Sequence, residues 1–290
     1  MSGKFTVEKI KKDDKEEILE LSSHIWEGHD YIPDVFDEWV EDGGFYCGKL
    51  DGKIIAVDKL TEQGNGVIWL EGLRVHPDYQ SKGYATKMVN GLMDILEELD
   101  YSALRFLTTA GKEPVKKMAG DHGFDIKQVY KYLLIDEERL ERFDKISLSG
   151  IEKASQSKLD RIMDFILSSE EYDDNNGQYM AHWTTYDITE ELIEDEIGRG
   201  NCYLIRDEEK IDSVIFFYYY EAYDTLSIAY VGGNEDGIIK LMEKGINLCK
   251  ENNYSSFTIK TASDKIIDCA KEVGMEPSDH YEILLFEKVN

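Results

Sequence analysis

The chain has 290 residues, of which 42% are hydrophobic and 11% aromatic, and its formal net charge at pH 7 is −27. This length is enough for one large domain or two ordinary ones, and the composition is that of a folded globular protein. The charge argues against a nucleic-acid partner, because no broad basic face can neutralise phosphates. No apolar run reaches membrane-spanning length, so the sequence also predicts no membrane partner.

The cysteines and the first residues bear on the cellular compartment. Four cysteines (Cys47, Cys202, Cys249 and Cys269) are scattered without the paired spacing of metal sites, in a chain too large to need disulfides. The first five residues lack a signal-peptide pattern. The sequence therefore predicts a cytoplasmic location and no metal, and it leaves the oligomeric state open.

The first half of the chain predicts an alternation of helices and strands. Apolar residues at helical spacing indicate helices over residues 10–26 and 31–41. The dipeptide Asp51-Gly52 suits a type I′ turn and predicts a hairpin between Phe45–Leu50 and Lys53–Leu60. The predicted elements that follow are strand Val67–Val75, helix 83–100, strand Leu104–Thr109, helix Glu113–Asp121 and strand Ile126–Asp136.

The second half of the chain repeats this order, which indicates a duplication. The charged segment 137–144 is the predicted linker, so we expect domains at residues 1–137 and 146–290. The predicted elements of the second half are strands 203–206 and 211–218 around a turn at 207–210, strand 225–231, helix 237–250, strand 256–260, helix 263–273 and strand 281–286.

The junction after strand Val67–Val75 carries the strongest functional signal. Gln80, Gly83 and Ala85 give the spacing Gln-x-x-Gly-x-Ala at the start of the next helix. A helix start offers unpaired N–H groups and the positive end of the helix dipole, and small residues let a ligand approach the backbone. The sequence therefore predicts that a phosphate-bearing cofactor binds here.

The second half differs at the corresponding junction. It has only the short segment Gly232–Gly237 there, with Glu235 and Asp236 near the helix start. Because these carboxylates would repel a phosphate, we expect the C-terminal unit to have lost cofactor binding.

The strand, loop and helix of the first junction, with Gly123-Phe124 closing the next helix, resemble the GNAT superfamily of acetyl-CoA-dependent acetyltransferases. The resemblance implies an α/β fold with a mixed sheet, present as two copies in tandem, and acetyl-CoA as the acetyl donor. In that family the strand before the loop pairs with the pantetheine arm, a role that falls here on Leu73, Arg74 and Val75. The pyrophosphate loop corresponds to Gln80, Ser81, Lys82, Gly83, Tyr84, Ala85 and Thr86.

The reaction also needs groups that move protons. A free amine is mostly protonated near neutral pH, so a nearby carboxylate must take its proton. Glu71 lies on the strand before the loop among apolar neighbours such as Trp69 and Leu70, which would raise its pKa. The alternative is that Glu71 simply faces solvent.

The proton donor is a more open question. Many relatives carry a Tyr four residues before the Gly of Gly-Phe, where this chain has Ala119. His122 and Asp121 are candidate replacements, with His122 our choice, and water is the alternative. For His76, in the turn before the loop, we expect a structural role.

Acceptor recognition is expected from the connection between the first two helices, residues 26–33. Trp26, His29 and Tyr31 are the candidate substrate-binding residues, and the alternative is a plain helix connection with Trp26 and Tyr31 in the core. This connection and the strand Trp69–Val75 resemble the histidine- and amino-acid-acetylating branch of the superfamily.

We therefore expect direct transfer of acetyl from acetyl-CoA to a primary amine of a small molecule, such as an amino acid or a polyamine. One alternative is a non-catalytic acyl-CoA-binding sensor or scaffold, which Ala119 favours. The other is an N-acetyltransferase that acts on a protein or peptide. The acidic composition suits a basic peptide as well as a polyamine, so charge does not choose between them.

Overall fold

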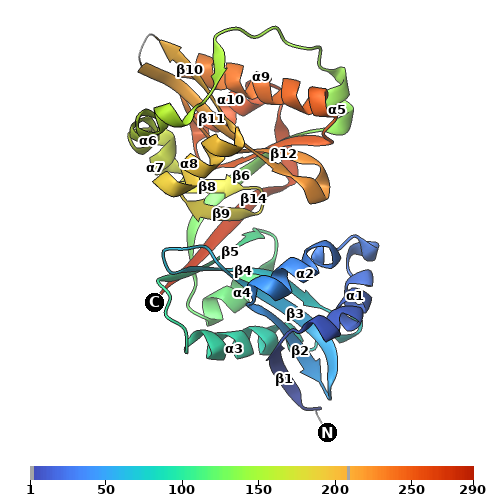
Figure 1. The fold of residues 1–290 in the computed structure, drawn as a ribbon. Coiled ribbons are helices and arrows are strands. Elements are labelled where there is room, and N and C mark those ends of the chain that lie inside the picture. The colour runs from blue at the N-terminus through green and yellow to red at the C-terminus, as the bar shows by residue number, and fades with distance from the viewer. Residues whose placement is uncertain (1–2, 208–209) are drawn as a thin grey trace. The chain divides into compact units, whose positions relative to one another are not determined.

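The computed structural model describes residues 3–207 and 210–290 of the chain (Figure 1). The chain divides into two compact units, and each is assembled from more than one segment. The first unit consists of Met1–Phe106, Lys117–Asp125 and Glu287–Asn290. The second consists of Leu107–Lys116 and Ile126–Phe286. Both units combine helices with a mixed sheet, as the sequence predicted.

The first unit begins with a strand and two helices, and a three-stranded meander follows. Its elements in chain order are β1 (Phe5–Lys9), η1 (Lys12–Asp14), α1 (Lys15–Ser23), η2 (Trp26–Gly28), α2 (Ile32–Asp42), β2 (Phe45–Leu50), β3 (Lys53–Glu62), β4 (Val67–Val75), η3 (Pro77–Tyr79), α3 (Tyr84–Leu96), β5 (Ala103–Thr109) and α4 (Glu113–Asp121). The strands lie in the order β1-β2-β3-β4-β5, and only the pair β4 and β5 is parallel.

Helices α1 and α2 cover one face of this sheet, and α3 packs on the other face. Phe36 of α2 shares a buried cluster with Cys47 of β2 and Val57 of β3. Gly48, the neighbour of Cys47, has the opposite orientation, and a Cβ added there would lie 3.2 Å from the sulfur of Met88 in α3. Neighbouring residues of a strand point to opposite faces, so the two helical layers lie on opposite sides of the sheet.

A β-bulge interrupts the ladder between β3 and β4. The register shifts so that one residue of β3, Asp58, lies opposite two residues of β4, Gly72 and Leu73. Gly72 has a φ of +76°, in the left-handed region that favours glycine. The ring of Trp39 also packs closely here, because a Cβ at Gly72 would lie 2.7 Å from it. The bulge therefore requires glycine for two independent reasons.

Strands β4 and β5 diverge soon after they begin to pair. Their parallel ladder joins only Val67–Trp69 to Ala103–Arg105. Strand β4 continues to Val75, so within the described residues its second half has no strand partner on the β5 side. This divergence leaves backbone groups of β4 free at the edge from which the chain leads to α3.

The second unit follows the same order of elements, with an added hairpin, β8–β9. Its elements are β6 (Asp125–Asp136), α5 (Glu137–Arg142), β7 (Ile151–Lys153), η4 (Gln156–Lys158), α6 (Leu159–Leu167), α7 (Glu170–Asp174), β8 (Gln178–Ala181), β9 (Thr184–Asp187), α8 (Glu190–Arg199), β10 (Cys202–Asp207), β11 (Lys210–Tyr220), η5 (Glu221–Tyr223), β12 (Thr225–Gly233), α9 (Glu235–Asn252), β13 (Ser256–Thr261), α10 (Asp264–Glu272) and β14 (Glu276–Val289). The main strands lie in the order β7-β10-β11-β12-β13-β6-β14.

The second sheet repeats the bulge and the divergence of the first. The β11–β12 register shifts between Phe216 and Phe217, which leaves Ala229 of β12 as an extra residue. The β12–β13 ladder covers only four residues of β12, Thr225–Ile228. Helices α9 and α10 share one core cluster with this sheet, and α6 and α8 share another.

The expected domains, 1–137 and 146–290, differ from these units in where they place strand β6 and the last residues of the chain. Strand β6 follows α4 in the chain, yet Leu133 and Ile135 pair with β13 and are fully buried in the core of the second unit. Residues Glu287–Asn290 at the end of β14 belong instead to the first unit, where the N–H of Asn290 donates to the carbonyl of Ser102. Strands that follow one another in the chain usually pair in the sheet, but β6 does not pair with β5, nor β14 with β13.

Most predicted elements occur, with shifted bounds. Strands Phe45–Leu50 and Val67–Val75 are confirmed as predicted, and both Asp51 and Gly52 have the positive φ of a type I′ turn. The first predicted helix is shorter, and strand β1 was not predicted. The predicted linker contains helix α5. The predicted turn at 207–210 includes residues outside the described ranges.

Gly72→Ala tests the bulge. We expect a loss of unfolding free energy of about 2–4 kcal/mol, because a Cβ is strained at positive φ and also meets the Trp39 ring. Denaturant unfolding measures the change. Gly120→Ala, in α4, is the matched control, since nothing lies within 4 Å of its added Cβ. Equal stability of the two variants would contradict this account of the bulge.

Candidate functional site

The turn after β4 is held by His76. Its buried ring accepts a hydrogen bond at Nδ1 from the N–H of Asp78, 3.2 Å away, and so caps η3. Gln80 then reaches back, and its Nε2 donates to the carbonyl of Val75 at 2.9 Å. Lys82 donates to the carbonyl of Asp78 at 2.6 Å. The structural role expected for His76 is confirmed, and the loop is fixed to the end of β4.

The start of α3 has the features of an anion site. Gly83, the N-cap residue, has a φ of +81°, and no side chain caps the helix. A Cβ at Gly83 would meet nothing within 4 Å, so the space beside the backbone is open. In the described chain the backbone N–H groups of Ser81, Lys82 and Gly83 donate to no other group. These N–H groups and the helix dipole suit a phosphate.

The matching helix start in the second unit is capped by a side chain of the protein itself. Asn234 caps α9, since its Oδ1 accepts from the N–H of Gly237 at 2.8 Å. An added Cβ would lie 2.3 Å from Ser213 Oγ at Gly233 and 2.0 Å at Gly237. The depression beside α9 has a volume of about 640 Å³, and its lining includes the carboxylates of Asp212, Glu235 and Asp236.

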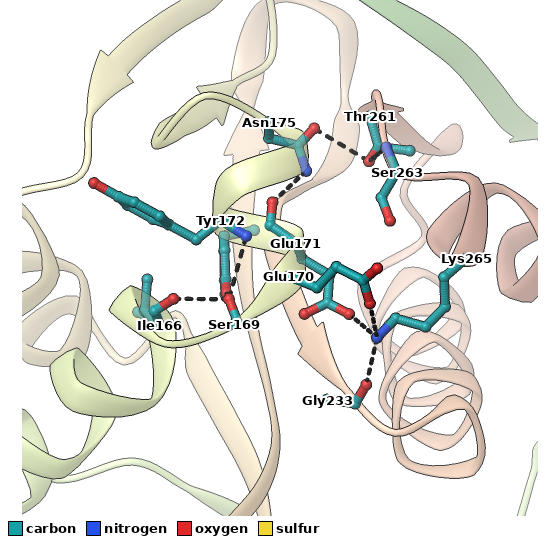
Figure 2. A network of polar contacts seen from close by, with 11 residues as sticks. Ile166, Ser169, Glu170, Glu171, Tyr172, Asn175, Gly233, Thr261, Ser263 and Lys265 are labelled. Carbon is teal, nitrogen blue, oxygen red and sulfur yellow. Dashed lines mark hydrogen bonds and ion pairs between the residues drawn. The ribbon is translucent and has the colours of Figure 1, made fainter.

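A polar network also fills the surroundings of Gly233 (Figure 2). The ammonium of Lys265, on α10, donates to the carbonyl of Gly233 at 3.2 Å and forms ion pairs with Glu170 and Glu171. Glu171 is only 2% exposed. The charge of Lys265, which lines the depression together with Lys240, is therefore balanced by the two carboxylates of α7.

In the first unit, Glu71 lies on the face covered by α1 and α2. It pairs across the sheet with Lys59, which points to the same face as Val57 of the α1–α2 core. Its Oε1 accepts a hydrogen bond from Thr61 Oγ1 at 2.5 Å. Burial raises the pKa of Glu71, although Thr61 and Lys59 oppose the shift. The apolar neighbours of Glu71 predicted this direction.

The bulge brings Arg74 to the same face. Arg74 pairs with Val57, and Glu71 pairs with Lys59, two residues further along β3. Partners in a ladder share a face, so side chains three residues apart on β4 point the same way. In a regular strand they would point to opposite faces.

Arg74 joins β4 to the connection between α1 and α2. Its Nε and Nη2 each donate to Oδ1 of Asp30 at 3.2 Å, and its Nη1 donates to the carbonyl of Leu73 at 3.2 Å. The guanidinium carbon lies 4.1 Å from the ring centroid of Trp26 and 5.2 Å from that of Tyr31. Burial raises the pKa of Tyr31 to about 12, so its hydroxyl stays protonated.

The structure therefore brings together four predicted site residues, Glu71, Arg74, Trp26 and Tyr31. The side chain of Arg74 contacts the acceptor connection, whereas the sequence assigned only its backbone. His29 is exposed, and in the described residues no contact joins its ring to this group. His122, at the end of α4, is half-buried, and in the described residues no contact joins its ring to this group either.

Sequence reasoning missed Asp58, the residue opposite the bulge. It is 2% exposed, burial raises its pKa well above the usual value, and both Arg74 and Glu71 act on it electrostatically. A lone carboxylate within the apolar strand 54–60 was the available signal.

One described cluster has metal-ligand chemistry. Glu20, His24 and His76 place possible ligand atoms within 4.8 Å of one another. The Nδ1 atom of His76 already accepts a hydrogen bond from the N–H of Asp78. The expectation of no metal stays a prediction.

Comparison with known proteins identifies the class of this fold and site. Residues 13–124 match the model of the Acetyltransferase (GNAT) family. This stretch contains the acceptor connection, the bulge, the loop and α3, so all four lie in the part of the chain that is similar to that family. In the described residues no helix is both long and apolar enough to cross a membrane.

Solved structures extend the likeness to the whole chain. A GCN5-related N-acetyltransferase from Sphaerobacter thermophilus matches with a TM-score of 0.67 at 12% identity, over 98% of this chain and 95% of that one. A tandem GNAT protein from the clavulanic acid biosynthesis pathway matches with a TM-score of 0.59 at 12% identity, over 99% and 98%. The fold is therefore that of a tandem GNAT protein.

A curated relative resembles the first unit in sequence. Histidine N-acetyltransferase of Scomber australasicus is 26% identical over 130 residues, which are 44% of this chain and 36% of the relative. The chain thus matches about a third of the length of that relative.

Glu71→Gln tests the electrostatic cost of the buried carboxylate. A raised pKa means that the folded state holds its proton more tightly, so Glu71 lowers stability as pH rises above about 4.5. We expect Glu71→Gln to raise the melting temperature at pH 8 and to have little effect at pH 4, where Glu71 is protonated in both states. Thermal unfolding across this pH range measures the difference, and a gain that is largest at pH 4 would contradict the assignment.

Proposed function

We propose that the protein transfers acetyl from acetyl-CoA directly to a primary amine of a small molecule. The observation that carries the proposal is the position of Glu71. It is a half-buried carboxyl with a raised pKa, on the part of β4 whose opposite edge is free of β5. Glu71 would thus act as a base beside the edge at which the GNAT fold binds its donor.

The residues of the first unit fit acetyl-CoA. The second half of β4, which includes Leu73 and Val75 and has no described strand partner on the β5 side, would bind the pantetheine arm through its backbone. The N–H groups from Ser81 to Thr86 would bind the pyrophosphate, with Gly83 leaving room for it. When bound, acetyl-CoA supplies a thioester that an amine can attack.

Glu71 would take the proton of the attacking amine. Burial raises the pKa of Glu71, which makes its carboxylate a stronger base than a solvated one. The N–H groups of β4 can donate to the oxyanion that forms. Burial raises the pKa of Cys47 to about 12, so this thiol is poorly suited to form an acyl-enzyme. This supports direct attack by the amine.

The proposal also covers the proton donor, the second unit and the partners of the protein. His122 is our candidate for protonating the departing thiolate, since Ala119 cannot do so, and water is the alternative. The second unit would not bind the donor, which the cap on α9 and the Lys265 network support. The expected cytoplasmic location and the absence of nucleic-acid partners stay part of this proposal.

The acceptor class draws support from the relative and from charge. The relative named histidine N-acetyltransferase acts, by its name, on a small amine. The face that holds Glu71 thus offers a carboxyl to a ligand with an amine. A sensor that binds acyl-CoA without turnover is the second candidate, favoured by Ala119.

Gly83→Leu tests donor binding. A side chain here would fill the open space beside the α3 start, so acetyl-CoA should no longer raise the melting temperature. Gly123→Leu is a matched control, because Gly123 also has a positive φ and open space but lies at the end of α4. It should keep the thermal shift seen with the unmodified protein. Retention of the full shift in Gly83→Leu would overturn the assignment of the loop.

Glu71→Gln tests turnover. Release of free thiol from acetyl-CoA should occur with at least one member of a panel of amino acids, polyamines, aminoglycosides and basic peptides. Glu71→Gln should lower kcat/KM about 10²–10⁴-fold at pH 7 and less at pH 10, where amines lose their protons unaided. Glu62→Gln, an exposed change on β3, should behave as the unmodified protein. Donor binding without release on the whole panel would favour the sensor.

A further inference from the structure

We propose that Arg74 is the residue that selects the acceptor, by binding a carboxylate that the acceptor carries beside its reacting amine. The inference rests on the proposed function and narrows it: the acceptor is an amino acid and not a simple amine. Nothing in the sequence pattern assigned the side chain of Arg74 to the acceptor.

The first support is geometric. The bulge at Gly72 turns Arg74 to the face that holds Glu71. Tyr31 lies close to both, since the charges of Arg74 and Glu71 each act on its hydroxyl. A ligand over this face can therefore meet the proposed base and the guanidinium together.

The second support is the hydrogen-bonding capacity of the guanidinium. An arginine side chain has five N–H groups, and Arg74 uses one from each nitrogen for Asp30 and Leu73. Tyr31 is also a hydrogen-bond partner of Arg74, so its hydroxyl oxygen takes one of the two N–H groups that remain. The last N–H of Arg74 and the O–H of Tyr31, which stays protonated, can then donate to the two oxygens of a carboxylate.

The third support is that the guanidinium is held in place and reachable. Asp30, whose side chain is fully buried, fixes one edge, and the rings of Trp26 and Tyr31 lie over its plane. The side chain of Arg74 remains 11% exposed. A guanidinium fixed in this way loses little conformational freedom when it binds a ligand.

The fourth support comes from charge. A chain of net charge −27 repels a carboxylate, so an acidic acceptor needs a local cation. Lys59 lies near Glu71 but is 2% exposed, burial lowers its pKa, and its Nζ donates to the carbonyl of Leu60. Arg74 is thus the cation that this face presents to a ligand.

The experiment compares an amino acid with the amine that lacks its carboxylate. Thiol release is measured with histidine against histamine and with lysine against cadaverine. We expect kcat/KM to be at least tenfold higher for the amino acid of each pair that reacts. Equal or better use of the amine would overturn the inference while leaving the proposed acetyl transfer intact, whereas no release with any acceptor would overturn both.

Variants then locate the preference. Arg74→Gln should lower kcat/KM for the amino acid tenfold or more, through KM, and should leave the amine and the acetyl-CoA thermal shift unchanged. Arg74→Lys keeps the positive charge but lacks the planar set of N–H donors of a guanidinium. It should retain only part of the preference for the amino acid. Lys15→Gln removes an exposed cation that pairs with Asp37 in the same unit. It should change kcat/KM neither for the amino acid nor for the amine. An equal loss for amino acid and amine in Arg74→Gln would assign Arg74 a structural role and overturn the inference.

Discussion

The bulge between β3 and β4 is the constraint on which the candidate site depends. One residue of β3 faces two of β4, and this single insertion reverses the orientation of every later side chain on β4. It brings Arg74 to the face of Glu71. The bulge in turn requires Gly72, because its backbone is left-handed and the Trp39 ring occupies the space of a Cβ.

The second unit shows that the fold alone does not make the site. It keeps the bulge and the early divergence of the parallel strands, here β12 and β13. The two units differ in how the following helix begins. Helix α3 has no side-chain cap and open space at Gly83, whereas Asn234 caps α9 and Ser213 fills the space beside it. A helix start whose N–H groups are already satisfied has little to offer an anion.

Electrostatics in this protein is local. The chain has 60 acidic side chains and 33 basic ones. A few of the carboxylates are buried, and these hold a cation in place. Asp30 orients Arg74, and Glu171 neutralises Lys265. The same type of ion pair thus fixes the position of one cation in each unit.

The sequence by itself determined what depends on near neighbours: the hairpin at Asp51-Gly52, the strand Val67–Val75, the glycine-containing helix start and the burial of Glu71 among apolar residues. Only the tertiary structure decided that β6 belongs to the second unit and that Glu287–Asn290 belong to the first. It also decided the contact of Arg74 with Asp30, 44 residues away. Local turn and helix signals are written in consecutive residues. The choice of a strand partner, and the face to which a bulge turns a side chain, depend on which distant surfaces bury the most apolar area together, and no short segment contains that information.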